Sequence, residues 1–544
     1  MTMLRITGGK VHDPANGIDG VVKDICIAEG RIVAQVEGGR SIDANGMLVF
    51  PGGVDIHTHV AGAALNFARG MTPENYRRAV PFLHGREQRA GLGGITPTTF
   101  ATGYLYAGMG WTTVNEAAVP ILSARHTHEE LHDIPIVDKA SLVLMANNEI
   151  VLDLLEAGEL ERARHVVAWL IWAAKAYGVK AVNPGGIVNW KWGKNAHVLS
   201  EPVEGYSRVT PAAIIAALAA IIDELGLPHP LHLHCNNLGI PGNVATTLET
   251  MKILEGRRAH LAHLQFHAYG GDGWGTMRSE APALAEYLNS HPNFTTDAGA
   301  VLFGDALTIT ADGPWQHLLY QLTGHKWGNV DVENETGCGI VPYAYKEKNL
   351  VNAVQWAAGL ELLLLVKDPW RIFLTTDHPN GGCFWRYPEL IRLLMSADQR
   401  REALGKLPPK ARKRMLLADL GREYTFSEIA IITSAGPARA LGLMGKGHLG
   451  VGADADVTIY PEKAEKGLAF AYPRYVIKGG EVAVEEGEIR AASEGREFIT
   501  HPACDEQIEE YLRPLFQKVY TMSFDNYPVE LERLTRPDVR TCPS

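Results

Sequence analysis

The stretch Pro51-Gly52-Gly53-Val54-Asp55-Ile56-His57-Thr58-His59 carries two histidines at alternate positions at the end of a short apolar run. Side chains two residues apart on a β-strand point to the same face, so His57 and His59 are expected to converge on one point. Imidazole suits zinc, copper, iron and nickel, and the pair therefore indicates one side of a metal site. The competing interpretation is two surface histidines, which the spacing alone does not exclude.

Later apolar runs also carry residues that can bind metal. They are residues 178–182 with Lys180, 230–235 with His232 and His234, 259–264 with His260 and His263, and 371–378 with Asp377. Helices are expected between such runs, at Pro211–Glu224 and Ala281–Ser290. Strands alternating with helices predict a parallel sheet, and ligands at the carboxyl ends of several strands predict an α/β fold with a closed (β/α)8 barrel.

The order of these residues resembles the amidohydrolase superfamily, with His-x-His after strand 1, a lysine after strand 4, histidines after strands 5 and 6, and an aspartate after strand 8. The resemblance implies two zinc ions bound by His57, His59, Lys180, His234, His263 and Asp377. It further implies that Lys180 is carboxylated and bridges the ions, because an unmodified lysine is a cation and a poor ligand. Two such ions activate water and polarise a carbonyl, and Asp377 would transfer the proton to the leaving amine.

Both ends of the chain resemble the small β-sandwich that accompanies these barrels. Short alternating runs with glycine turns fill residues 4–48, and residues 447–457 resemble the return of the chain to that sandwich. We therefore expect four parts: residues 1–52 and 438–496 as the two halves of the sandwich, 53–437 as the metallohydrolase barrel, and 497–544 as a C-terminal extension.

The residues that flank three of the expected ligands resemble a narrower family. They are Lys180-Ala181-Val182-Asn183-Pro184-Gly185-Gly186, His234-Cys235-Asn236-Asn237-Leu238-Gly239 and Thr375-Thr376-Asp377-His378-Pro379-Asn380-Gly381-Gly382. These motifs are similar to the A subunits of the bacterial formyltransferase/hydrolase complex and of archaeal formylmethanofuran dehydrogenase. The resemblance implies hydrolysis of formyl-methanofuran or formyl-methylofuran to formate and the free carrier amine in one-carbon metabolism, or, in the dehydrogenase, condensation of formate with methanofuran. It implies as partners a formyltransferase, a subunit related to pterin-dependent dehydrogenases and a β-helical subunit.

Without the resemblance, several of these residues have simpler interpretations. Lys180 could be an ordinary lysine that extends to solvent, and Asp377 a turn residue before Pro379. The residues proposed to orient the formyl group or the furan carrier could also be turn formers; they are Asn183, Asn236, Asn237 and His378. Among the other histidines, His232 is an alternative to His234, and His260 is expected to be structural. A solvent-exposed helix face is expected for His126, His128 and His132.

Composition excludes some classes of function. The 544 residues carry a formal net charge of −11, which argues against a nucleic-acid partner because phosphate binding needs a basic surface. No apolar run reaches membrane-spanning length, and the start lacks the apolar core of a signal peptide, so a cytoplasmic protein is expected. The six cysteines form no Cys-x-x-Cys cluster, which disfavours an iron-sulfur site.

Two other classes of function remain open. One is a cyclic amide hydrolase of the dihydropyrimidinase or hydantoinase kind, which shares the metal spacing. The other is a scaffold protein that keeps the barrel without metals. Outside the core pattern, residues 91–97 and 104–111 are expected to be loops, and the aromatic residues of 497–544 to pack on the barrel or on another polypeptide of a complex.

Overall fold

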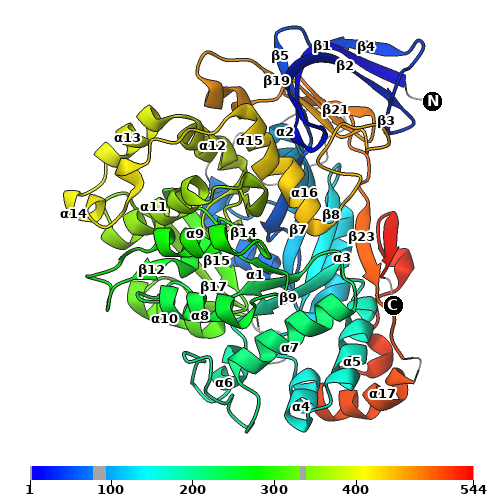
Figure 1. Cartoon of the computed structure of the whole chain (residues 1–544). Coiled ribbons are helices and arrows are strands. Elements are labelled where there is room, and N and C mark those ends of the chain that lie inside the picture. Colours follow the sequence, from blue (N-terminus) through cyan, green and yellow to red (C-terminus); the bar gives the residue numbers. More distant parts are fainter. Residues whose placement is uncertain (1–2, 78–93, 331–337, 506, 543–544) are drawn as a thin grey trace.

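The centre of the molecule, in a computed structural model that describes residues 3–77, 94–330, 338–505 and 507–542, is a parallel barrel with helices around it (Figure 1). Its strands, in the order in which they pair, are β6 (Gly53–Thr58), β7 (Trp111–Val119), β8 (Asp138–Leu144), β9 (Gly178–Val182), β10 (Leu231–His234), β11 (Ala259–Leu261), β14 (Phe294–Asp297) and β18 (Ile372–Phe373). The ring closes by a parallel bridge between Thr58 and His378 and a 2.8 Å hydrogen bond from the His59 amide to the His378 carbonyl. The predicted (β/α)8 barrel is confirmed.

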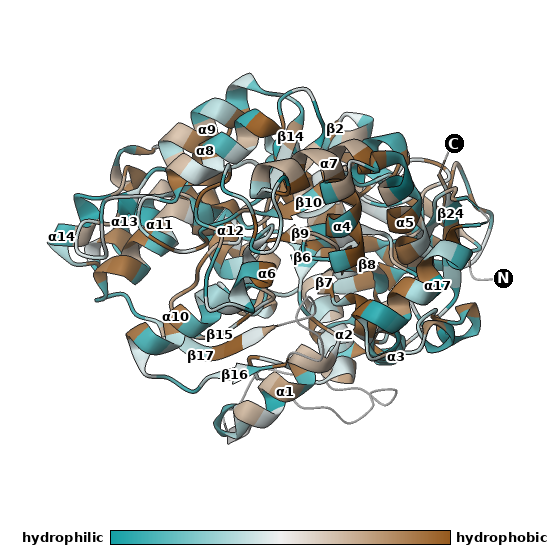
Figure 2. Ribbon diagram, turned by 90° about the horizontal axis from the view of Figure 1, so that it is seen from below, coloured by the Kyte–Doolittle hydropathy of each residue, from teal (hydrophilic) through white to brown (hydrophobic). Residues whose placement is uncertain are grey.

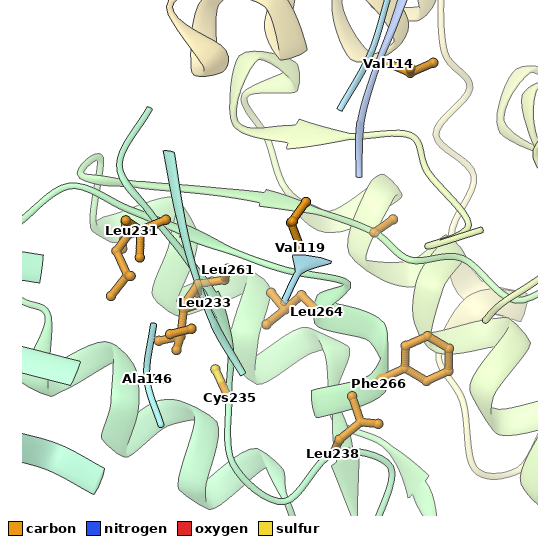
Figure 3. Close-up of a cluster of buried hydrophobic side chains, with 14 of the residues drawn as sticks. Val114, Val119, Ala146, Leu231, Leu233, Cys235, Leu238, Leu261, Leu264 and Phe266 are labelled. Atoms are coloured by element: carbon orange, nitrogen blue, oxygen red, sulfur yellow. The ribbon is translucent and has the colours of Figure 1, made fainter. Parts of the chain in front are cut away.

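Alternation along β10 shows how the sequence divides the barrel into inside and outside. Leu231 and Leu233 belong to the main apolar core, and Figure 3 shows them on one side of their strand. The intervening His232 and His234 project to the other side, into the barrel, because successive side chains of a strand point to opposite faces. The next strand pairs in register, with His232 opposite His260.

The outer helices lie where the sequence predicted them. Helix α7 (Pro211–Glu224) begins at the N-cap Thr210, whose hydroxyl accepts a 3.1 Å hydrogen bond from the amide of Ala213, and Pro211 occupies its first turn. Helix α9 (Ala281–Ser290) also has the expected bounds. Figure 2 shows β6 to β10 near the centre of the molecule, with α5 (Leu160–Ala173) and α7 beside them.

A nine-stranded mixed sheet joins both ends of the chain above the barrel (Figure 1). Its strands come from residues 3–51 and 457–489; β5 (Met47–Pro51) pairs with β19 (Val457–Pro461), and β5 leads into β6 after one residue. The first half of the sheet therefore fixes the start of the strand that carries His57 and leads into His59.

A buried ion cluster ties this sheet to the barrel. Asp138, the first residue of β8, pairs with Lys446 and, at 2.7 Å, with Lys478 of β20 (Tyr475–Lys478). Asp456 lies 2.6 Å from Lys446 and 2.8 Å from Lys478. All four side chains are nearly inaccessible to solvent. Buried charges of this kind are tolerated only while each keeps its partners.

Asp138→Asn is expected to lower the free energy of unfolding by about 3–5 kcal/mol, because it leaves two buried ammonium groups short of an anion. Chemical denaturation followed by far-UV circular dichroism measures this. The control is Asp24→Asn, which breaks an exposed pair with Arg5 and should cost no more than about 1 kcal/mol. Equal losses in the two variants would contradict the interpretation.

Glu361 on α11 (Leu350–Leu365) gives the barrel a pH-dependent element. Burial raises the pKa of Glu361 to about 7, although hydrogen bonds from Ser279 and the amides of Leu416 and Leu417 oppose this shift. The folded state therefore holds a proton that the unfolded chain has released above its ordinary pKa of 4.5. The stability that this proton provides is present below pH 4.5 and is lost as pH rises to about 7.

Glu361→Gln is expected to remove this pH dependence, worth about 3 kcal/mol between those limits, because glutamine keeps an acceptor for the amides without titrating. Thermal unfolding across pH 4.5–7 measures it, with the exposed Glu402→Gln as control. A wild type whose stability does not fall over this interval relative to Glu361→Gln would refute the assignment.

The C-terminal extension packs on the barrel, as its aromatic content predicted. Strand β23 (Glu497–His501) pairs in parallel with β8, and β24 (Pro537–Thr541) pairs with β23. Helix α17 (Ile508–Val519) lies beside α5 (Figure 1). Trp169 of α5 contacts Phe516, Phe524 and Tyr527, with ring centroids 5.1–5.8 Å apart.

Two expectations are wrong. Residues 104–109 form the end of α2 (Thr99–Met109) rather than a loop, because Gly103 packs directly against Pro135 and lets the helix lie on the barrel. Residues 91–93 lie outside the described residues. His128 is not solvent-exposed: it is buried in α3 (Ala124–Asp133), where its ring contacts Glu497 at 2.8 Å and the Ala174 carbonyl at 2.9 Å. In the described part of the chain, no helix has the length and apolarity needed to cross a membrane.

Candidate metal centre

The six predicted ligands lie at the same end of the barrel. His57 is in β6 and His59 follows it; Lys180 is in β9, and His234 ends β10. His263 comes two residues after β11, and Asp377 comes four residues after β18. All six side chains are buried. The carboxyl ends of parallel strands meet at one face of a barrel, which is where such barrels hold their active sites.

His57, His59 and Asp377 form the first part of the site. The Nε2 atoms of both histidines lie 3.1 Å from Oδ1 of Asp377. Nevertheless Oδ1 of Asp377 is buried without a hydrogen bond of good geometry among the described residues. Two nitrogens and an oxygen that face one another closely, with one atom unsatisfied, fit the ligand set of a metal ion.

Glu116, near the end of β7, contacts the ring nitrogen of His59 that faces away from Asp377. Its Oε1 lies 3.0 Å from Nδ1 of His59, and its Oε2 accepts hydrogen bonds from the amides of Val60 and Ala61. A carboxylate accepts only, so Nδ1 of His59 carries a proton, and Nε2, which lies 3.1 Å from Asp377, is the nitrogen left to bind a metal ion. Burial opposes the cation, but Asp377 and Glu116 outweigh it and raise the pKa of His59 to about 9. A position that attracts a proton so strongly also favours a metal cation.

Lys180 lies beside the first part of the site. Its Nζ lies 3.0 Å from Nε2 of His57, and the side chain is only 1% exposed. The interpretation of a lysine that extends to solvent is therefore wrong. Burial lowers the pKa of Lys180 to about 8, although Asp377, Asp297 and Glu116 oppose the shift. The neutral amine, which is the form that reacts with carbon dioxide, is thus more available than for an exposed lysine.

His234 and His263 form the second part. Their ring centroids are 4.7 Å apart, and His263 Nε2 lies 4.0 Å from Oδ2 of Asp377. Nε2 of His234 and Nδ1 of His263 are buried without a hydrogen-bond partner in the described residues. Oδ2 of Asp312, the N-cap of α10 (Gly313–Thr323), lies 3.4 Å from that Nε2. Unsatisfied buried imidazole nitrogens are costly unless an ion or ligand occupies the site.

Backbone strain gathers at this end of the barrel. Asn183, His263 and Asp377 have φ angles of 39°, 33° and 50°, in the left-handed region that non-glycine residues seldom adopt. Gly299 makes the conformation of His263 possible, because a Cβ there would lie 2.3 Å from the Cβ of His263. Such strain concentrates at functional sites.

A cavity of about 240 Å³ opens above the site. Its lining contains His59, Lys180, His234, His263 and Asp377, while His57 is fully buried beneath it. Its outer wall comes from the chain between β14 and β18, where β15 (Gly304–Thr310) pairs with β17 (Gly339–Tyr345) next to α10. The wall is mostly apolar and aromatic, with Leu238, Phe266, Trp274, Trp315 and Tyr343.

The four residues predicted to contact substrate, Asn183, Asn236, Asn237 and His378, are not part of this lining. Instead the asparagine amides hold loops together. Asn183 Nδ2 donates to Asp312 at 2.9 Å, Asn236 donates to Asn183 at 2.8 Å, and Asn237 donates to the His197 carbonyl at 2.8 Å. Polar residues that do line the cavity include Thr308, Gln355 and Asn380.

Sequence reasoning missed Glu116, Asp297 and Asp312. Asp297 ends β14 and Glu116 lies near the end of β7, so a systematic search of every strand end for carboxylates could have found both. Asp312 carried a weaker signal, the N-cap position before Pro314.

A model of the Amidohydrolase family matches residues 40–484. Protein FwdA of Methanocaldococcus jannaschii is 45% identical over 97% of this chain and 96% of its own length. The A subunit of the formyltransferase/hydrolase complex Fhc of Methylorubrum extorquens is 38% identical over 97% of this chain and 96% of its own length.

Solved structures agree with these matches. A crystal structure of the formyltransferase/hydrolase complex FhcABCD from Methylorubrum extorquens in complex with methylofuran contains a chain that superposes with a TM-score of 0.94 at 37% identity, and each chain covers 100% of the other. The N-acyl-D-glutamate deacylase of Bordetella bronchiseptica superposes with a TM-score of 0.51 at 16% identity over 91% of this chain and 99% of its own, which shows the fold alone.

Proposed function

The chain belongs to the amidohydrolase family, and we propose that it hydrolyses the formyl amide of formyl-methylofuran or formyl-methanofuran to formate and the free carrier amine. One observation carries the proposal: the chain matches, over its whole length, a component of a formyltransferase/hydrolase complex that was crystallised with methylofuran. The buried group of imidazole, lysine and carboxylate side chains at the base of an apolar cavity, which are residue types that can hold metal ions, supports it.

Two zinc ions bound here would activate water and polarise the formyl carbonyl. His57, His59 and Asp377 would hold the first ion, and His234 and His263 the second. Lys180, carboxylated on Nζ, would contribute one oxygen to each. Zinc is favoured because hydrolysis needs a Lewis acid without redox chemistry, and because imidazole and carboxylate are ligands that it accepts.

The residues of the chain then handle the proton and the carrier. Water adds to the formyl carbon while a carboxylate oxygen of Asp377 takes its proton. Asp377 returns that proton to the amine nitrogen as the C–N bond breaks, which gives the free amine and formic acid, and the acid ionises to formate. Trp274 and Tyr343 offer aromatic surface against which the furan ring of the carrier could pack.

We also propose that the chain works inside a multi-subunit complex with a formyltransferase, a subunit related to pterin-dependent dehydrogenases and a β-helical subunit. A second candidate function is the reverse reaction at the same site, in which formate condenses with methanofuran in a dehydrogenase complex. This second function is kept because the chain is 45% identical to Protein FwdA and 38% identical to the A subunit of Fhc.

The test of the substrate is to offer the purified complex formyl-methylofuran, formyl-methanofuran, hydantoin and dihydrouracil, and to measure formate and ring opening. Release of formate from a formyl carrier with no turnover of the cyclic amides is expected. Turnover of the cyclic amides alone would favour a dihydropyrimidinase-like enzyme, and no turnover with no bound metal would favour a scaffold protein. The polypeptides that co-purify separate the hydrolase complex from the dehydrogenase complex.

The metal content is expected to be two zinc ions per chain, measured by elemental analysis of a homogeneous sample. His57→Ala should lose most of this metal, because Nε2 of His57 faces both Asp377 and Lys180. The exposed His126→Ala is the control and should keep it. A stoichiometry far below two zinc ions per chain, together with activity that chelators do not change, would contradict the proposed metal centre.

A further inference from the structure

A chain of buried imidazoles runs from the candidate metal centre towards the opposite end of the barrel. Nδ1 of His57 lies 3.1 Å from Nε2 of His232, and Nδ1 of His232 lies 3.1 Å from Nε2 of His229. Nδ1 of His229 lies 2.8 Å from the carbonyl oxygen of Ala440, in α16 (Gly436–Leu441). The three rings are fully buried. The interior of such a barrel is usually filled by branched apolar side chains, so a row of three buried histidines needs an explanation.

The carbonyl at the far end fixes where each proton lies. A carbonyl oxygen only accepts, so Nδ1 of His229 must donate to Ala440. His229 has no carboxylate partner among the described residues, and burial lowers its pKa to about 3, so its ring is neutral and Nε2 accepts. His232 must therefore donate from Nδ1, and its own Nε2, which lies 3.9 Å from the nearest oxygen of Asp297, is left as an acceptor.

The proton of the last link consequently lies on Nδ1 of His57. Asp297 imposes the same assignment independently, because its Oδ2 lies 3.0 Å from Nδ1 of His57 and a carboxylate only accepts. Asp297 is itself held: His260 contacts Oδ2 at 3.1 Å, and the His263 amide and the Thr375 hydroxyl donate to Oδ1. With Nδ1 protonated, the lone pair of His57 lies on Nε2, the atom that faces Asp377 and Lys180.

We propose that His229 and His232 are positioning residues for the metal centre: anchored on the Ala440 carbonyl, they hold His57 in the tautomer and ring orientation that present Nε2 to the metal. His232, which alternates with the predicted ligand His234, thus orients the ligand His57 and does not itself bind the ion. The inference rests on the proposed metal centre. Partners of this kind usually change metal affinity by about 10–100-fold.

The test measures zinc affinity of the metal-free protein by competition with a chromophoric chelator, independently of activity. His232→Phe keeps an aromatic ring and removes the acceptor, so zinc affinity should fall by ~10–100-fold. His232→Gln keeps an acceptor near the position of Nε2 and should retain more affinity than His232→Phe. A residue that only fills space would give the opposite order, because phenylalanine is the closer match in shape.

His229→Phe extends the test to a residue that does not contact a proposed metal ligand. The same variant tests the proposal if His232→Phe fails to fold. It should weaken zinc binding by ~10-fold. The control is His128→Phe, another fully buried histidine that contacts a backbone carbonyl, at 2.9 Å, but lies outside this chain of rings. It should leave affinity unchanged.

The outcomes separate the two proposals. A wild type that binds no zinc would overturn the metal centre and with it this inference. A wild type that binds two zinc ions, with folded His229→Phe and His232→Phe variants that bind them as tightly, would overturn the positioning role alone.

Discussion

Lys180→Ala is expected to lose the bound metals and the hydrolase activity together. Lys180 is buried, its Nζ lies 3.0 Å from Nε2 of His57, and it lines the same cavity as His234 and His263; in the proposed site its carboxylated side chain is shared by both ions. Its removal deletes one ligand from each ion, which should cost more than the roughly 10–100-fold that follows loss of an outer partner. Turnover below about 1% of the wild type is therefore expected, measured with metal content on the same sample.

The neighbouring strand supplies a matched control. Lys139 of β8 is also fully buried, its pKa is likewise lowered to about 8 by burial, and its Nζ has no hydrogen-bond partner in the described residues. Lys139→Ala should leave the metal content unchanged. A short-chain carboxylic acid added to Lys180→Ala should restore part of the metal and activity by filling the vacated bridge. Lys180→Ala that keeps two metals and full turnover, or density for an unmodified ammonium group turned away from the ligands, would refute the bridging role.

The barrel was predictable because several strand ends carry the same kind of signal. A pair such as His57 and His59 predicts a shared face, and the spacing from His234 to His263 predicts one strand-helix-strand unit; both depend only on local geometry. Local geometry could not show how far along the barrel axis each side chain lies. His232 and His234 face the same way, but only the stagger of the strands decides which imidazole reaches the cavity.

The walls of the cavity were harder to predict for a different reason. Strands β15 and β17 pair across a long segment that includes α10, and nothing in the local pattern indicates that they cover the barrel mouth. The asparagines beside the ligands illustrate the same limit. Asn183 and Asn237 have φ angles of 39° and 63°, typical of turn-forming asparagine, so the sequence signal was one of backbone conformation rather than of contact with a ligand.

Asp377→Asn is expected to behave differently from Lys180→Ala, keeping most of the metal while turnover falls by ~10² to 10⁴-fold. The amide oxygen of asparagine can still face His57 and His59, each now 3.1 Å from Oδ1. The left-handed backbone at this position, with φ of 50°, suits asparagine, so the substitution should not disturb the turn. An amide cannot take the proton from the attacking water or return it to the amine, and that loss should appear in kcat.

The histidines that surround Asp377 keep its side chain ionised. Burial favours the protonated form, but His57 and His263 outweigh this and hold the pKa of Asp377 well below its ordinary value, so the side chain is a carboxylate, the form that a metal ligand and a general base must have. Asp368→Asn, at an N-cap where Oδ1 accepts from the Trp370 amide, is the control and should leave kcat unchanged. Metal content and steady-state kinetics measured on the same preparations decide the matter: an Asp377→Asn variant with full metal and undiminished kcat would return this aspartate to the role of a turn residue before Pro379.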